Sequence, residues 1–200
     1  MKKLISSILL FVSFVGITSA NADPSAYLEG IANTMIKEIE QNKEALKADN
    51  SLAEKLVRDH LLPVIDKESF AKSTLGKTIW KDLTDEQRGK FIDGYINRVI
   101  NKYAKGLSLY DGQAFEFDKA EFSDKSDKVR VKSEMKQEGS TPLDIYYILK
   151  PANDSWLITN MSIAGTSVTK SYRTQFLPRI KEIGFDKFLE ELATQTDPEE

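Results

Sequence analysis

The feature that most constrains the fold is a change in hydrophobic periodicity near Gly112. Before this point, apolar residues recur every three or four positions, as on one face of a helix. From Phe115 to Met161 they alternate with polar residues, as in half-buried strands, and helical spacing returns after Gly165. Helices and strands that are segregated in this way predict an α+β fold with an antiparallel sheet.

The helices have recognisable start and stop signals. Ser51 with Glu54, and Thr84 with Gln87, have the spacing of capping boxes, and Asp66 is a good N-cap. Pro63 and Gly76 are expected to end helices. The predicted helices cover 24–48, 51–62, 67–75, 85–107, a segment after Gly165 that includes Val168 to Ile180, and 185–193.

Four antiparallel strands are predicted between these helical regions. Polar turns separate them at 124–127, 138–140 and 153–154. The strands cover 115–117, 129–136, 143–150 and 155–161. The expected fold is a small four-stranded twisted sheet with helices packed on one face.

The N-terminus has the pattern of a secretory signal peptide. Lys2 and Lys3 precede an apolar run from Leu4 to Ile17, and Ala20-Asn21-Ala22 has the small-x-small pattern of a cleavage site. The run is shorter than the roughly 20 residues of a membrane-spanning helix. We therefore expect residues 1–22 to be cleaved, residues 23–200 to form a single domain, and the protein to reach the periplasm.

Composition argues against several functional classes. Removing Lys2 and Lys3 from the 28 basic residues leaves 26 against 31 acidic ones, a formal charge of −5. Nucleic-acid binding needs clustered basic residues, so no nucleic-acid partner is expected. The chain has no Cys and a single His, His60, which exclude a thiol nucleophile and a His-rich metal site. No G-x-S-x-G, G-x-G-x-x-G or phosphate-loop motif is present. Neither metal, cofactor nor catalysis is expected.

The apolar faces of the helices and sheet have two possible uses. If they pack fully against each other, they form an ordinary close-packed core. If they are held apart, they line a cavity that suits an acyl chain. Periodicity does not distinguish these arrangements, and on pattern alone the plain core is favoured because cavities cost stability.

Several strings of residues carry a more specific signal. They are Leu61-Leu62-Pro63-Val64-Ile65-Asp66, Leu75-Gly76 followed by Trp80, and Ser167-Val168 followed by Tyr172-Arg173-Thr174-Gln175-Phe176. In this order and spacing, from about Leu52 to Leu192, the chain resembles the MlaC family, also called the toluene-tolerance or ABC-transporter auxiliary family.

The resemblance implies a periplasmic carrier of glycerophospholipid, held in an apolar pocket between helices and a twisted sheet of cystatin-like or nuclear-transport-factor-like shape. It also implies two partners: an outer-membrane lipoprotein complex and an inner-membrane ABC transporter with a lipid-binding subunit. Lipid carried between them would maintain outer-membrane lipid asymmetry. The bound phospholipid would be cargo, and the carrier is expected to be a monomer.

On this hypothesis, apolar residues from the helices and the sheet line the pocket. The predicted lining residues are Leu62, Ile65, Phe70, Phe91, Tyr95, Val99, Tyr103, Tyr147, Leu149, Trp156, Val168, Tyr172 and Phe176. For each of them, a place in the plain core is the alternative. Arg173 is the candidate for a head-group contact, with a surface ion pair as its alternative. Tyr103 and Tyr110 are candidates for the lip of the pocket.

Two other functions remain open at this point. The same kind of fold also holds small isomerases and hydrolases, so an enzyme with polar groups converging in the cavity is one alternative. Asp144 is expected on the opposite strand face from Tyr147, which argues against that reading. A periplasmic adaptor with a solid core is the other.

Overall fold

The computed structural model describes residues 23–194; the predicted signal peptide, residues 1–22, lies outside the described residues. The α-helices are α1 (Pro24–Gln41), α2 (Lys43–Ala48), α3 (Asn50–Leu56), α4 (Lys67–Leu75), α5 (Lys77–Asp82), α6 (Asp85–Ser108), α7 (Val168–Ile183) and α8 (Phe185–Thr194). A π-helical turn, η1 (Val57–Leu61), and a 3₁₀ turn, η2 (Leu62–Val64), follow α3. The strands are β1 (Ala114–Phe117), β2 (Glu121–Phe122), β3 (Val129–Lys136), β4 (Leu143–Ala152), β5 (Ser155–Ile163) and β6 (Thr166–Ser167).

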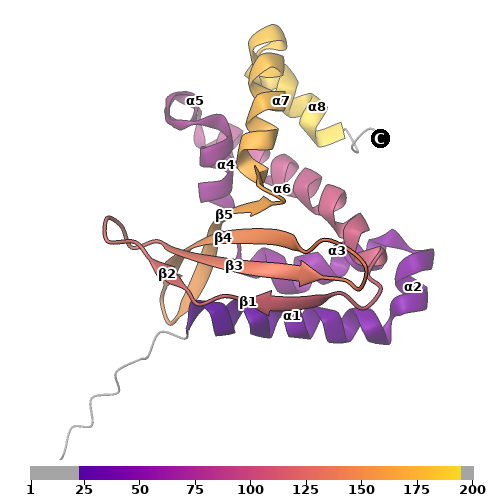
Figure 1. The fold of residues 1–200 in the computed structure, drawn as a ribbon. Helices are drawn as coiled ribbons and strands as arrows, with labels where there is room; N and C mark the ends of the chain where they lie inside the picture. The colour runs from indigo at the N-terminus through magenta and orange to yellow at the C-terminus, as the bar shows by residue number, and fades with distance from the viewer. Residues whose placement is uncertain (1–22, 195–200) are drawn as a thin grey trace, which may run out of the picture.

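The strands form one antiparallel sheet with the order β1-β3-β4-β5-β6, and β2 pairs with β3. In Figure 1 the sheet crosses the middle of the molecule, with α1 along the side of β1 and α4, α5, α7 and α8 at the opposite side. The α+β class is confirmed. The predicted count of four strands is wrong, because β2 and β6 add two strands whose two residues are too few to show alternation.

The capping signals give the helix boundaries with one exception. Asp66 accepts from the Ser69 N–H at 3.0 Å and begins α4, which ends at Gly76 with φ +83°. Ser51, predicted as an N-cap, is instead inside α3: the carboxylate of Asp49 accepts from the Ser51 N–H at 2.8 Å and caps the helix. Asp49 competes successfully because its carboxylate is an equally good cap two residues earlier.

Three helical segments differ from the prediction. The helix predicted over 51–62 is α-helical only to Leu56, and it continues as η1 and η2, so Pro63 lies inside the 3₁₀ turn and does not follow the helix end. The helix predicted over 24–48 is divided at Asn42, whose side-chain amide donates to the Glu38 carbonyl at 2.8 Å and ends α1. Helix α5 was not predicted, because its six residues contribute only Trp80 to the buried core and show no helical stripe.

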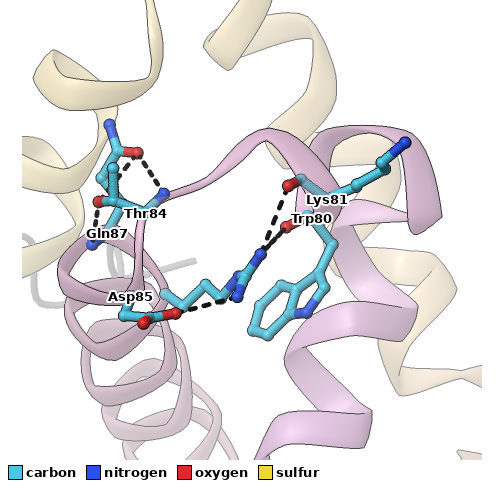
Figure 2. A network of polar contacts seen from close by, with 6 residues as sticks. Trp80, Lys81, Thr84, Asp85 and Gln87 are labelled. Atoms are coloured by element: carbon cyan, nitrogen blue, oxygen red, sulfur yellow. Dashed lines mark hydrogen bonds and ion pairs between the residues drawn. The ribbon is translucent and has the colours of Figure 1, made fainter.

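The corner between α5 and α6 is fixed by backbone capping, as Figure 2 shows. Thr84 accepts from the Gln87 N–H at 3.2 Å while the Gln87 side chain accepts from the Thr84 N–H at 3.1 Å, which confirms the predicted capping box. Arg88 donates to the Trp80 carbonyl at 3.1 Å and lies over the Trp80 ring. These bonds satisfy the last carbonyl groups of α5.

Candidate lipid-binding site

The sheet presents one apolar face toward the helices. Its register places Val129 beside Leu149, Val131 beside Tyr147, and Tyr147 beside Met161. The opposite face is charged: Lys132 lies 2.7 Å from Glu134 and 3.1 Å from Asp144. Because side chains alternate along a strand, Asp144 and Tyr147 lie on opposite faces, as predicted.

Burial along the apolar face is uneven. At one end, Val129, Leu149 and Ile158 are almost completely buried, and β5 packs there against α4 and α7. Further along, Tyr147 on the central strand β4 and Met161 on β5 stay half-buried although they face the helices. Tyr147 and Met161 therefore keep accessible surface beside residues of the same face that are buried, namely Val131, Ser133 and Ile145.

Two close-packed clusters make up the core. The sheet core joins the sheet to α4, α6, α7 and α8 and includes Phe70, Phe91, Tyr95, Leu149 and Phe176. The helical core joins α1, α2, α3, η1 and α6 and consists of Met35, Ile39, Leu46, Ala53, Leu56, Val57, Ile96, Ile100 and Ala104. Leu61, in the π-helical turn, is only partly buried and packs against both. The turn thus lies where the two cores meet.

A hollow of about 390 Å³ opens between α1 and η1. It is lined by Ala26, Tyr27, Gly30, Ile31, Thr34 and His60. Helix α1 also packs against β1 and β3, so it borders both the hollow and the sheet. We call this hollow the α1–η1 groove. The groove is open to solvent, whereas the sequence predicted a cavity enclosed between helices and sheet.

One polar contact connects the two sides of the α1–η1 groove. His60 Nε2 on η1 lies 2.9 Å from Glu38 Oε1 on α1. His60 reaches the groove from the π-helical turn. Such turns are rare in proteins, and those that occur are often found at functional sites. The His60 side chain is 24% exposed at the groove.

A second hollow, of about 230 Å³, lies between α6, α7 and α8. Its lining includes Arg98, Arg179 and Glu191. Arg179 forms an ion pair with Glu191, and Arg98 lies over the Phe176 ring. This charged lining suits an acyl chain poorly, because burying apolar atoms against charges leaves the charges desolvated.

The thirteen predicted lining residues divide into two groups. Nine are nearly fully buried in the close-packed core: Phe70, Phe91, Tyr95, Val99, Leu149, Trp156, Val168, Tyr172 and Phe176. The rings of Tyr95, Tyr172 and Phe176 contact one another with centroid separations of 5.2–5.8 Å. The other four, Leu62, Ile65, Tyr103 and Tyr147, retain accessible surface. Their contact with lipid stays a prediction for all thirteen.

Burial also affects the tyrosine hydroxyls of the sheet core. Burial raises the pKa of the Tyr147 phenol, and the hydrogen bond with Ser133 lowers it by a smaller amount. Burial likewise raises the pKa of Tyr95. Both phenols are therefore neutral at physiological pH and present O–H groups.

Arg173, the predicted head-group contact, lies at the C-terminal end of α4. Its Nε donates to the Thr74 carbonyl at 3.0 Å and one Nη donates to the Ser73 carbonyl at 2.5 Å. The guanidinium thus satisfies carbonyls that end a helix. Tyr110, a predicted lip residue, is partly buried against the helical core.

The sequence did not identify the residues of α1 that line the groove, nor the half-buried Phe117 and Met161 on the sheet. Tyr27 and Ile31 read as part of an ordinary amphipathic stripe. Only the packing of α1 against both η1 and the sheet distinguishes them from core.

The sequence matches one protein family and two characterised relatives. The family described as MlaC protein matches residues 29–194. The intermembrane phospholipid transport system binding protein MlaC of Haemophilus influenzae is 25% identical over 190 residues, covering 92% of this chain and 88% of that protein. The toluene tolerance protein ttg2D of Pseudomonas putida is 22% identical over 179 residues, covering 90% of this chain and 83% of that protein.

The fold also matches a solved structure. The phospholipid-binding protein of Ralstonia solanacearum, crystallised with a phospholipid, superposes with a TM-score of 0.74 at 21% sequence identity. The match covers 86% of this chain and all of that chain. At this identity, the likeness establishes a shared fold.

Proposed function

The chain belongs to the MlaC family, and from this we propose that it carries phospholipid through the periplasm between an outer-membrane and an inner-membrane complex. It is a phospholipid-binding transport protein, and its relative in Haemophilus influenzae is named for the same role. Among residues 23–194, no three His, Cys, Asp or Glu side chains gather to hold a metal ion.

The observation that supports this proposal best is the half-buried state of Tyr147 and Met161. Both lie on inner strands of the sheet and face the helices, where a solid core would bury them. The α1–η1 groove opens beside the helix that borders this face. Together they provide an apolar surface and an entrance to it.

The energetics of an acyl chain fit such a surface. Each buried methylene contributes about 0.8 kcal/mol, so an apolar slot alone gives tight binding. The groove, about 390 Å³, is at the small end of the roughly 300–1,000 Å³ typical of ligand sites. A phospholipid with two chains therefore requires α1 and η1 to separate.

We assign the lining to side chains that remain accessible between the two cores. From the predicted set these are Leu62, Ile65, Tyr103 and Tyr147. To them we add Tyr27, Ile31, Phe117 and Met161. The nine nearly buried members of the predicted set serve as the core that holds this surface in shape.

Loading and release follow from the need to open the groove. A complex that binds the separated arrangement of α1 and η1 more tightly than the closed one shifts the carrier toward lipid exchange. The proposed partners are an inner-membrane ABC transporter with a lipid-binding subunit and an outer-membrane lipoprotein complex. No helix between residues 23 and 194 combines the length and apolarity needed to span a bilayer. Residues 1–22, acting as a cleaved signal peptide, deliver the chain to the periplasm.

The function is tested by extracting the purified periplasmic protein with organic solvent and analysing the extract by mass spectrometry. The carrier predicts glycerophospholipid in near-stoichiometric amount. An extract without lipid, from a protein that also takes none from vesicles, contradicts the proposal and favours a solid-core adaptor. Turnover of an added lipid would favour an enzyme.

A further inference from the structure

The apolar face of the sheet carries one polar exception at its centre. On β1, β3 and β4, the residues in register on this face are apolar except for the Ser133 hydroxyl and the Tyr147 hydroxyl. The two oxygens lie 3.3 Å apart and hydrogen bond to each other. Ser133 is 0% exposed. A buried polar pair in apolar surroundings needs an explanation, because unsatisfied hydroxyls are costly there.

The pair has more donors than the protein uses. Each hydroxyl has one O–H donor, so the two residues together have two. Their mutual bond uses one donor, whichever residue gives it. The second O–H is therefore left for an acceptor outside the pair.

The position of Tyr147 indicates where that acceptor comes from. Ser133 is sealed by its neighbours, but Tyr147 is half-buried on the central strand and its ring stacks on Phe117 at 6.3 Å. A molecule that lies on the apolar face of the sheet thus reaches the pair past the Tyr147 ring. Such a molecule must be mostly apolar and must carry an acceptor within its apolar part.

A diacyl lipid has this chemistry, since its two ester carbonyls accept hydrogen bonds at the root of the apolar chains. We propose that the Ser133–Tyr147 pair donates a hydrogen bond to an ester carbonyl of the bound phospholipid, and so selects ester-linked over ether-linked lipids. This inference rests on the proposed function. It assigns the pair a role in specificity, because an ether oxygen is a much poorer acceptor and would leave the second O–H unsatisfied.

The test compares two phosphatidylcholines with the same chain lengths, one with ester and one with ether linkages. The delipidated protein should bind the ester lipid about three- to tenfold more tightly, the range expected for one neutral hydrogen bond. The double variant Ser133→Ala with Tyr147→Phe should bind both lipids equally. Tyr146→Phe makes the same chemical change on the opposite sheet face, beside Arg130, and should keep the ester preference.

The outcomes separate this inference from the proposed function. Equal affinity of the unmodified protein for both lipids would overturn the inference while leaving lipid transport intact, and this measurement does not require any variant to fold. An ester preference that persists in a double variant with native circular dichroism would also overturn it. If the unmodified protein binds neither lipid, the proposed function falls as well.

Discussion

His60 Nε2 on the π-helical turn lies 2.9 Å from Glu38 Oε1 on α1, and this contact joins the two sides of the α1–η1 groove. If lipid exchange requires α1 and η1 to separate, this pair opposes opening. Its partial exposure limits its strength, because exposed polar contacts to a carboxylate contribute only about 0.2–1 kcal/mol.

The first prediction concerns this pair. Glu38→Gln should increase the rate of spontaneous phospholipid transfer to acceptor vesicles by about two- to fivefold, because the opening step loses part of its cost. Stopped-flow dequenching of a fluorescent phospholipid measures the rate. Glu29→Gln, an exposed residue on the same helix, should transfer lipid at the unmodified rate. Identical rates for the two variants would rule out the pair as a barrier.

A second prediction concerns Asp66, which caps α4 and forms an ion pair with Lys150 on β4. Partial burial raises the pKa of Asp66, but hydrogen bonds from Lys150 and Ser69 outweigh this and leave the pKa below 3.8. A carboxyl with a lowered pKa in the folded state stabilises the fold above its unfolded pKa. That stability is lost as the pH falls through the folded pKa.

Asp66→Asn should therefore lower the free energy of unfolding by about 1–2 kcal/mol at pH 7 while preserving the cap. The difference from the unmodified protein should shrink at an acidic pH below about 3.9, the pKa of an unfolded Asp. Urea unfolding at the two pH values measures it, with the exposed Asp124→Asn as control. A deficit of the same size at both pH values would contradict the assigned ion pair.

A third prediction uses two glycines in α6. A Cβ built on Gly94 would lie 2.9 Å from Leu192 Cγ, whereas a Cβ on Gly106 meets nothing within 4 Å. Gly94→Ala should destabilise the protein by about 1–3 kcal/mol by displacing α8. Gly106→Ala should stabilise it by about 0.5–1 kcal/mol through helix propensity. Thermal unfolding of both variants measures the opposite shifts, and a stabilised Gly94→Ala would mean that α8 does not pack on α6 as described.

The fourth prediction separates two roles of Arg173. Its bonds to Ser73 and Thr74 indicate that it caps α4. Arg173→Met should then lower the free energy of unfolding by about 1–3 kcal/mol. The ratio of affinities for anionic and zwitterionic phospholipids should stay unchanged. A loss of anionic preference in a variant that is still folded would support the head-group contact instead.

The sequence predicted the fold well where a local signal acts alone. Thr84 with Gln87, Asp66 and Gly76 mark helix ends through bonds within one turn, and strand alternation gave the four long strands. The site was harder to predict, because core and lining use the same apolar residues. Phe91 and Tyr147 each lie on the apolar face that the period of their own element predicts, yet Phe91 is fully buried in a ring cluster and Tyr147 is not. That difference depends on tertiary packing of α1 and η1, which periodicity does not encode.

The central claim is that a phospholipid chain enters through the α1–η1 groove, and Gly30→Trp tests it most directly. Gly30 lines the groove and a Cβ built there meets nothing within 4 Å, so we expect a Trp side chain to begin without a clash and to fill the entrance. Gly89→Trp adds the same side chain at an exposed, equally open position on α6. Mass spectrometry measures the phospholipid bound per mole of purified protein. This amount should fall by about fivefold or more in Gly30→Trp, which corresponds to a loss of roughly 1 kcal/mol of binding free energy. It should stay unchanged in Gly89→Trp. Equal, undiminished lipid in both variants would contradict entry through this groove.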